Sequence, residues 1–273
     1  MLRLDGHIHI QDVTVDNKIM MQHMEEVGIS GGIVLSKPPC WLEESNLSFQ
    51  QRVDQVLSFC DGEKYLFPFF FIDPLEKDAL KQIDYAVENG IRGFKIICGR
   101  HYPSHPDCIE TCKKIAENDK PLLFHSGILW DGINNSGNYN KPTEFEILLQ
   151  INKLKFSLAH ISWPWTDECI AVYGKFNEAT ILGKKTAAEM FIDTTPGTPP
   201  IYRKSALERL LLTGYNINDN VIFGLDNYTD SYDVKWAKEN MDRDDKIYDE
   251  LNIPTETRKK IYSENLLRFV NEK

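Results

Sequence analysis

Two histidines near the start of the chain, His7 and His9, are separated by a single residue within an apolar stretch. In a β-strand, side chains two residues apart point to the same face, so the two imidazoles would lie together. Two imidazoles on the inner face of a sheet are costly unless they are hydrogen-bonded or bound to a metal. Chance also produces such a pair in a chain with seven histidines among 273 residues, so further residues must support a metal site.

Ionisable side chains also lie in or at the end of four later apolar stretches. They are Lys95, His125, His160 and Asp226, in the stretches 93–98, 121–125, 156–161 and 221–226. Three imidazole nitrogens and one carboxylate oxygen suit Zn²⁺ or a related divalent metal, with a position left open for water or substrate. The pattern therefore predicts a divalent metal site, with Zn²⁺ the expected ion.

Short apolar stretches alternate with longer amphipathic segments along the chain. The predicted strands are 2–10, 31–36, 65–72, 93–98, 121–125, 156–161, 190–194 and 221–226. Most of them are continuously apolar, which is typical of parallel strands covered on both faces. The predicted helices are 16–27, 46–60, 75–88, 106–118, 142–154, 165–176, 203–212 and 255–270.

Eight strand–helix units with no linker or low-complexity segment favour an α/β fold of the (β/α)₈ TIM-barrel type, as a single domain over residues 1–273. A doubly wound open sheet is the alternative. It would need a glycine-rich phosphate loop after the first strand, and Gly6 alone does not supply one. Active sites of TIM barrels lie at the carboxyl ends of the strands, where the polar residues above fall.

The chain carries a net charge of −10 and has a pI of about 5.2, which argues against nucleic acid or an anionic membrane as the main partner. It has no apolar run of the ~20 residues that a membrane span needs, and no signal-peptide core near its N-terminus. We therefore expect a cytoplasmic protein that binds a small-molecule substrate, with a homo-oligomer left open. The six cysteines form no CxxC pair and are interpreted as core residues, although Cys108 and Cys112 could share a helix face.

The sequence resembles the amidohydrolase superfamily, and within it the amidohydrolase-2 branch, which includes aminocarboxymuconate-semialdehyde decarboxylase and pyrone-dicarboxylate lactonase. The resemblance runs almost from end to end and is closest at residues 158–168. It also covers segments 5–9, 73–74, 93–96, 124–127, 221–226 and 261–266. One departure weakens any transfer of substrate identity: Asn227 and Tyr228 follow Asp226, where many relatives have a tyrosine and a proline.

The resemblance implies that His7 and His9 ligate the metal, that His125 is the ligand from strand 5, and that Asp226 both ligates the metal and shuttles a proton. It implies for His160 either a second-metal ligand, as in binuclear members, or a substrate-polarising group or base, as in mononuclear ones.

Lys95 has two roles among the relatives. It would be carbamylated and bridge two metals, or remain an ammonium group that binds a substrate carboxylate. The amidohydrolase-2 resemblance favours the ammonium group and a single metal.

The predicted function is metal-dependent hydrolysis of a C–O or C–N bond, in a lactone, ester or amide of a small carboxylate-bearing substrate. A bound metal would lower the pKa of its water towards about 7, and Asp226 would accept the proton and return it to the leaving group. The predicted catalytic residues are Asp226, His160 and Lys95. The predicted substrate-binding residues are Lys95, Arg100, His101, Trp130 and Trp163, with the loop 128–141 as a lid.

Two alternatives use the same site. In the first, the protein is a non-oxidative decarboxylase of an unsaturated or aromatic carboxylic acid, and His160 or Asp226 protonates the carbon. In the second, it is a metal- or ligand-binding barrel without catalytic activity. Arg100 and His101 would also fit a solvated loop, and Trp163 would also fit ordinary packing.

Overall fold

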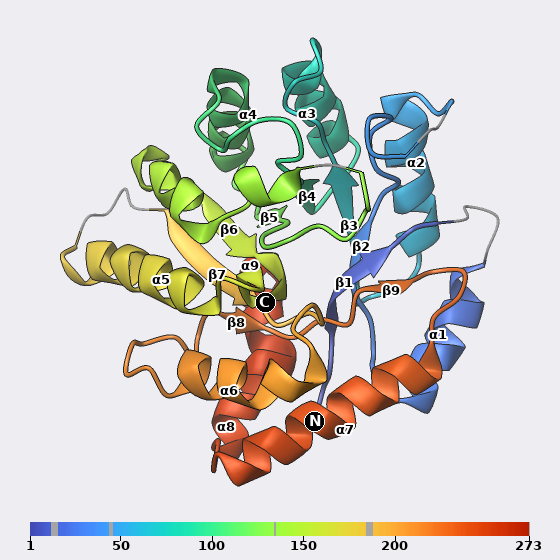
Figure 1. The fold of residues 1–273 in the computed structure, drawn as a ribbon. Helices are drawn as coiled ribbons and strands as arrows, with labels where there is room; N and C mark the ends of the chain where they lie inside the picture. Colours follow the sequence, from blue (N-terminus) through green and yellow to red (C-terminus); the bar gives the residue numbers. More distant parts are fainter. Residues whose placement is uncertain (12–15, 44–45, 134, 184–187, 273) are drawn as a thin grey trace.

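The computed structural model describes residues 1–11, 16–43, 46–133, 135–183 and 188–272, and its strands form one parallel sheet wound into a barrel (Figure 1). The strand order is β8-β7-β6-β5-β4-β3-β2-β1-β9. The strands are β1 (Asp5–His9), β2 (Gly32–Leu35), β3 (Leu66–Phe71), β4 (Gly93–Ile96), β5 (Leu122–Phe124), β6 (Lys155–Leu158), β7 (Glu189–Asp193), β8 (Val221–Ile222) and β9 (Asn227–Tyr228). The predicted (β/α)₈ barrel is confirmed.

The eighth barrel position is divided between β8 and β9. β8 pairs with β7 and β9 pairs with β1, while the amide of Gly6 donates a 2.8 Å hydrogen bond to the carbonyl of Phe223 between them. Asp226 lies at the break with a φ of 58°, in the left-handed region that ends a regular strand. The predicted strand 221–226 is therefore corrected to two short strands, and together they close the barrel against β1.

Helices surround the sheet and cover its outer face (Figure 1). They are α1 (Asn17–Glu26), α2 (Phe49–Cys60), α3 (Ala79–Glu88), α4 (Pro106–Glu117), α5 (Thr166–Ile181), α6 (Pro200–Leu211), α7 (Val234–Glu250), α8 (Thr255–Lys259) and α9 (Asn265–Phe269). A π-helical turn (Lys260–Glu264) joins α8 to α9, so the predicted last helix is present. The predicted α-helix 142–154 was wrong in type, because Pro142–Gln150 is a 3₁₀ helix.

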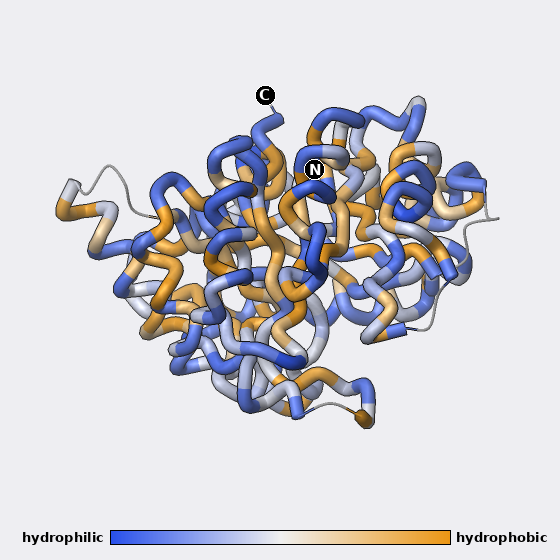
Figure 2. The backbone as a smooth tube through the Cα atoms, turned by 90° about the horizontal axis from the view of Figure 1, so that it is seen from above, coloured by the Kyte–Doolittle hydropathy of each residue, from blue (hydrophilic) through white to orange (hydrophobic). Residues whose placement is uncertain are grey.

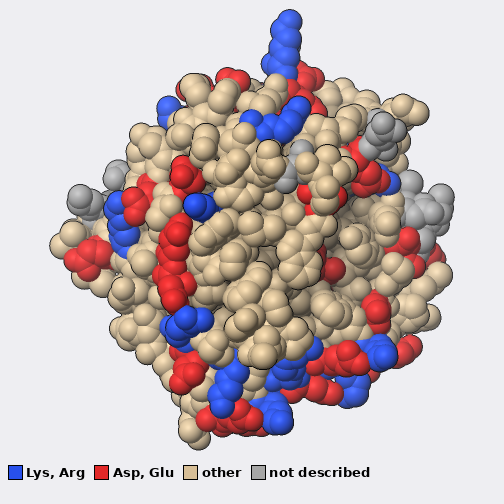
Figure 3. Space-filling model, in the orientation of Figure 1, with Lys and Arg blue, Asp and Glu red and all other residues tan. Residues whose placement is uncertain are grey.

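Helix α7 is the longest α-helix in the described ranges, and it is not among the helices predicted from the sequence. Its sequence is mostly charged, and its exposed side carries the i,i+4 ion pairs Lys235–Glu239 and Lys238–Asp242. Red and blue side chains gather along the lower margin of the molecule in Figure 3, where α7 runs in Figure 1. A search for a broad apolar stripe overlooks such a helix, whose buried face is narrow.

Apolar side chains fill two separate spaces. One core lies between the sheet and the helices, and the other lies inside the barrel. Within the barrel, the ring of Phe269 in α9 lies 5.0 Å from that of Phe191 and 6.3 Å from that of Phe69. Figure 2 shows this apolar interior in orange, with both chain ends together on one side of the molecule. Because α9 fills the amino end of the barrel, polar residues at the carboxyl end are the ones that meet a pocket.

Among the described residues, no helix combines the length and apolar character that crossing a membrane requires.

Candidate active site

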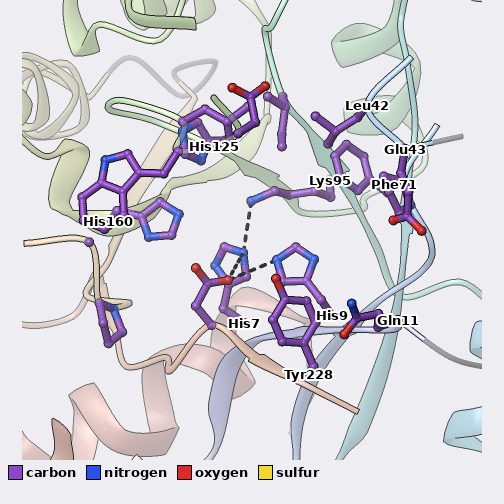
Figure 4. A pocket seen from close by; sticks show the side chains of 18 of the residues that line it. His7, His9, Gln11, Leu42, Glu43, Phe71, Lys95, His125, His160 and Tyr228 are labelled. Carbon is purple, nitrogen blue, oxygen red and sulfur yellow. Dashed lines mark hydrogen bonds and ion pairs between the residues drawn. The ribbon is translucent and has the colours of Figure 1, made fainter. Parts of the chain in front are cut away.

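Three of the predicted ligands converge at the carboxyl end of the barrel, where Figure 4 shows His7 and His9 side by side. His7 and His9 point inward from β1, and Asp226 reaches them from the break between β8 and β9. Asp226 Oδ1 lies 3.2 Å from His9 Nε2 and 3.8 Å from His7 Nε2. One ligand atom from each of the three residues lies within 4.8 Å of the others, which is close enough for all three to bind one ion.

A carboxylate that the sequence analysis did not single out lies behind His7. Asp193 Oδ2 is 2.9 Å from His7 Nδ1, and both side chains are buried. Thr195 donates to the other oxygen of Asp193 through its hydroxyl and its backbone amide. With Nδ1–H donated to Asp193, the Nε2 of His7 is directed at the shared space, which is the arrangement that orients histidine ligands in metal sites.

A second buried carboxylate, Asp5, holds the site's backbone together. Its Oδ1 accepts from the amides of His7 at 3.0 Å and Leu225 at 2.8 Å, and its Oδ2 lies 3.3 Å from the hydroxyl of Tyr232. Burial raises the pKa of Asp5 to about 8 despite these hydrogen bonds. Asp5 thus links the strand that carries the two histidines to the segment that carries Asp226.

Lys95 points into the barrel from β4 and is 1% exposed. Its Nζ lies 3.3 Å from His7 Nε2. Burial lowers the pKa of Lys95 to about 8, and the negative charges of Asp193 and Asp226 oppose that shift. Near neutral pH this side chain is therefore a buried cation within reach of the three converging residues.

His125 and His160 form a second imidazole pair on the opposite wall. Their ring centroids are 5.1 Å apart, and His160 lies 5.3 Å from the ring of His7. His125 Nε2 and His160 Nδ1 are buried and have no hydrogen-bond partner within the described residues. Burial lowers the pKa of His160 to about 4, so this imidazole is neutral. His125 borders the pocket without belonging to the three-residue group, and its role as a fourth ligand stays a prediction.

The chain turns sharply at His160. The φ angles of His160, Ile161 and Ser162 are 63°, 48° and 53°, three consecutive residues in the left-handed region. Non-glycine residues adopt this region at an energetic cost, and such strain is concentrated at functional sites. Gly197 allows the turn to approach, because a Cβ there would lie 2.9 Å from the Cβ of His160.

A pocket of about 440 Å³ opens above these residues. Its floor is polar, and its walls include Phe71, Trp130, Trp163 and Tyr228. The ring of Trp163 stacks on that of Tyr202, with 5.1 Å between the ring centroids. The predicted lid loop 128–141 contributes its first four residues to the wall, while residue 134 lies outside the described residues. A small molecule with a planar apolar part and a polar end fits these surroundings.

Arg100 and His101 are not brought to the pocket. Arg100 forms an ion pair with Asp73, and its guanidinium lies 5.0 Å from the ring centre of Trp41. His101 is buried beside Cys98 instead. Of the five predicted substrate-binding residues, Lys95, Trp130 and Trp163 line the pocket.

The residues at the pocket floor fit a divalent cation. They offer two imidazole nitrogens and a carboxylate oxygen, with a carboxylate behind His7 to orient it. Burial, together with the charge of Lys95, lowers the pKa of His7 well below its usual value, so His7 is in the neutral form that binds metals.

No protein-family model matches this sequence, and no curated protein matches it either. Solved structures do share its fold. A 2,6-dihydroxybenzoate decarboxylase complexed with 2,6-dihydroxybenzoate is 13% identical, with 99% of both chains covered and a TM-score of 0.65. The 5-carboxyvanillate decarboxylase of Novosphingobium aromaticivorans, with bound manganese, is 13% identical over 95% of this chain and 81% of its own, with a TM-score of 0.62. The dihydroorotase of Campylobacter jejuni is 17% identical over 99% and 83%, with a TM-score of 0.60.

These similarities define the class of fold. The chain shares the barrel fold of these two decarboxylases and of this dihydroorotase, which confirms the fold that the resemblance in sequence implied. The same fold carries both kinds of reaction, so the reaction must be argued from the site.

Asp193→Asn should lower metal affinity or turnover by about 10–100-fold, the usual cost of losing a residue that orients a metal ligand. The amide keeps the shape of Asp193 but weakens its hold on the Nδ1–H of His7. Titration of metal-stripped protein with Zn²⁺ measures the change. Asp167→Asn, at an exposed residue paired with Arg209, is the matched control and should leave the affinity unchanged. Equal affinities in all three proteins would show that Asp193 does not orient His7 for binding.

Proposed function

We propose that this chain is a metal-dependent hydrolase that cleaves a C–O or C–N bond in a lactone, ester or amide of a small carboxylate-bearing substrate. The observation that carries the proposal is the convergence of His7, His9 and Asp226 at a pocket floor beside buried Lys95. His125 is the proposed fourth ligand, and the proposed ion is a single Zn²⁺. The ion would supply Lewis-acid activation of water or of the substrate carbonyl. The proposed compartment is the cytoplasm.

The remaining steps belong to the chain's own side chains. Asp226 is 35% exposed towards the pocket, where its carboxylate can accept a proton from water and return it to the leaving group. His160, neutral because of its burial, would contact the carbonyl oxygen of the substrate. Lys95, as an ammonium group, would bind the substrate carboxylate and orient the bond to be cleaved.

Non-oxidative decarboxylation of an unsaturated or aromatic acid is the second candidate. The aromatic pocket walls favour it, as does the similarity in fold to the two decarboxylases. In this reaction Lys95 would again hold a carboxylate, and His160 or Asp226 would deliver a proton to the carbon that loses CO₂.

Product analysis separates the two reactions. Purified protein loaded with Zn²⁺ or Mn²⁺ is incubated, in ¹⁸O-labelled water, with a panel of carboxylate-bearing lactones, esters and amides and with aromatic carboxylic acids. Hydrolysis places ¹⁸O in the product, and this is the expected result. Release of CO₂ without ¹⁸O in the organic product would replace the hydrolase with the decarboxylase. Bound metal with no turnover of any compound would support a binding barrel without catalysis.

His7→Ala and His160→Ala should have different effects on the metal. His7→Ala removes a ligand nitrogen, so the protein should lose its pocket metal. His160 lies outside the three-residue ligand group, so His160→Ala should retain the pocket ion and lose turnover by about 10²–10⁴-fold, the usual contribution of an acid–base group. Metal analysis and kinetics on the same samples test both results. His23→Ala, on α1 far from the pocket-lining residues, is the control. Two pocket ions in the wild type and one in His160→Ala would instead indicate a two-metal site that includes carbamylated Lys95.

A further inference from the structure

A cluster of thiols and one imidazole lies between β4 and α4. Cys98 follows the end of β4, His101 lies in the next turn, and Cys108 and Cys112 lie one turn apart on α4. Cys98, Cys108 and Cys112 are fully buried free thiols, and His101 is 5% exposed. One ligand atom from each of Cys98, His101 and Cys108 lies within 4.8 Å of the others. The spacing is Cys-x₂-His-x₆-Cys-x₃-Cys.

The cluster faces away from the candidate active site. Lys95 and Ile97 line the pocket, whereas Ile96 and Cys98 belong to the core between the sheet and the helices. This alternation follows from the strand-like chain at the end of β4, in which successive side chains point to opposite faces. The cluster is therefore separated from the pocket by the wall of the barrel.

Ordinary packing leaves this arrangement unexplained. The Nε2 of His101 is buried and has no hydrogen-bond partner among the described residues. A buried polar nitrogen left unpaired is costly, and native structures contain few of them.

We propose that Cys98, His101, Cys108 and Cys112 bind a structural Zn²⁺ ion, at a second metal site distinct from the one in the pocket. Three sulfurs and one imidazole form a common tetrahedral zinc set, and soft thiolate ligands select Zn²⁺ over harder cations. Cys112 lies outside the group of three, and as the i+4 neighbour of Cys108 it can complete the set by a side-chain rotation.

The proposed ion would fix the connection between β4 and α4. This connection includes Arg100, which pairs with Asp73, and the carbonyl of Cys98, which accepts from Asn140 Nδ2 at 3.0 Å. Binding at such a site contributes directly to folding, because the unfolded chain does not hold the ligands together.

Cobalt(II) titration of the metal-stripped, reduced protein tests this site alone. The proposed pocket ligands are nitrogen and oxygen atoms, so thiolate-to-cobalt charge-transfer absorption in the near ultraviolet reports the cysteine cluster whether or not the pocket binds metal. We expect the band in the wild-type protein and in Cys60→Ala, which removes a buried cysteine on α2. We expect Cys108→Ser and His101→Ala to lose most of the band or to need a higher cobalt concentration.

Two results would overturn the proposal. One is the absence of the charge-transfer band in folded wild-type protein whose thiols are shown to be reduced. The other is a disulfide between any two of these cysteines in freshly isolated protein, detected by peptide mass spectrometry. Because the wild-type spectrum decides the first result, a variant that fails to fold does not affect the test. The outcome is also independent of whether the protein proves to be a hydrolase.

Discussion

Asp226→Asn should lower kcat by about 10²–10⁴-fold, the contribution expected of a positioned proton-transfer group. The amide nearly preserves the shape of the side chain at the break between β8 and β9, but it cannot accept a proton from water. It also removes the negative charge that lies 3.2 Å from His9 Nε2, so metal affinity should fall as well. Steady-state kinetics at saturating metal, with a substrate from the compound panel, measure the effect on turnover separately from that on metal binding.

Asp242→Asn is the matched control, because Asp242 is an exposed carboxylate on α7 paired only with Lys238 among the described residues. Its turnover should equal that of the wild type. Asp226→Asn protein that keeps most of its turnover at saturating metal would contradict the assigned proton path. The proton would then have to pass through another group, with His160 as the nearest candidate.

Asp244→Ala should reduce the free energy of unfolding by about 3–5 kcal/mol, the usual cost of breaking a buried ion pair by removing one partner. Arg203 and Asp244 are both 3% exposed and join α6 to α7. The guanidinium of Arg203 donates to both oxygens of Asp244, at 2.9 Å and 2.5 Å, and to the carbonyl of Thr194 at 2.6 Å. Without Asp244, the cation would remain buried with its charge uncompensated. Urea unfolding followed by circular dichroism measures the loss.

Two comparisons make this test specific. The double variant Arg203→Met/Asp244→Leu removes both charges and should recover a large part of the stability, because an apolar pair of similar volume often replaces a buried ion pair at little cost. Asp242→Ala removes one partner of an exposed pair and should cost at most about 1 kcal/mol. Asp244→Ala that is no less stable than Asp242→Ala would show that Arg203 finds water or another partner.

The ion pair between Arg203 and Asp244 is linked to the candidate active site through the backbone at the end of β7. Arg203 donates to the carbonyl of Thr194, which follows Asp193, the carboxylate that orients His7. A loosened α6–α7 contact would therefore free the end of β7, and Asp244→Ala should show weaker metal binding in addition to its lower stability.

The barrel and the main site residues could be predicted from the sequence, because local rules cover them. The strands are continuous apolar runs, and a buried strand alternates its side chains strictly, so His7 and His9 had to share a face. His125, His160 and Asp226 lie at or next to the ends of such apolar runs. Parallel strands in a barrel bring their carboxyl ends to the same face of the barrel. Each of these predictions rests on a few neighbouring residues.

What the sequence did not reveal depends on contacts between distant segments. His7 and Asp193 are 186 positions apart, and no local sequence pattern predicts their hydrogen bond, although Asp193 lies one residue before the end of a predicted strand. Arg100 turns towards Asp73, and His101 towards Cys98, because strand-like alternation at the end of β4 and the packing of α4 place their loop outside the barrel wall. The four residues Cys98, His101, Cys108 and Cys112 form one cluster only when α4 folds back against β4. Sequence spacing limits which residues can meet, and tertiary packing decides which of them do.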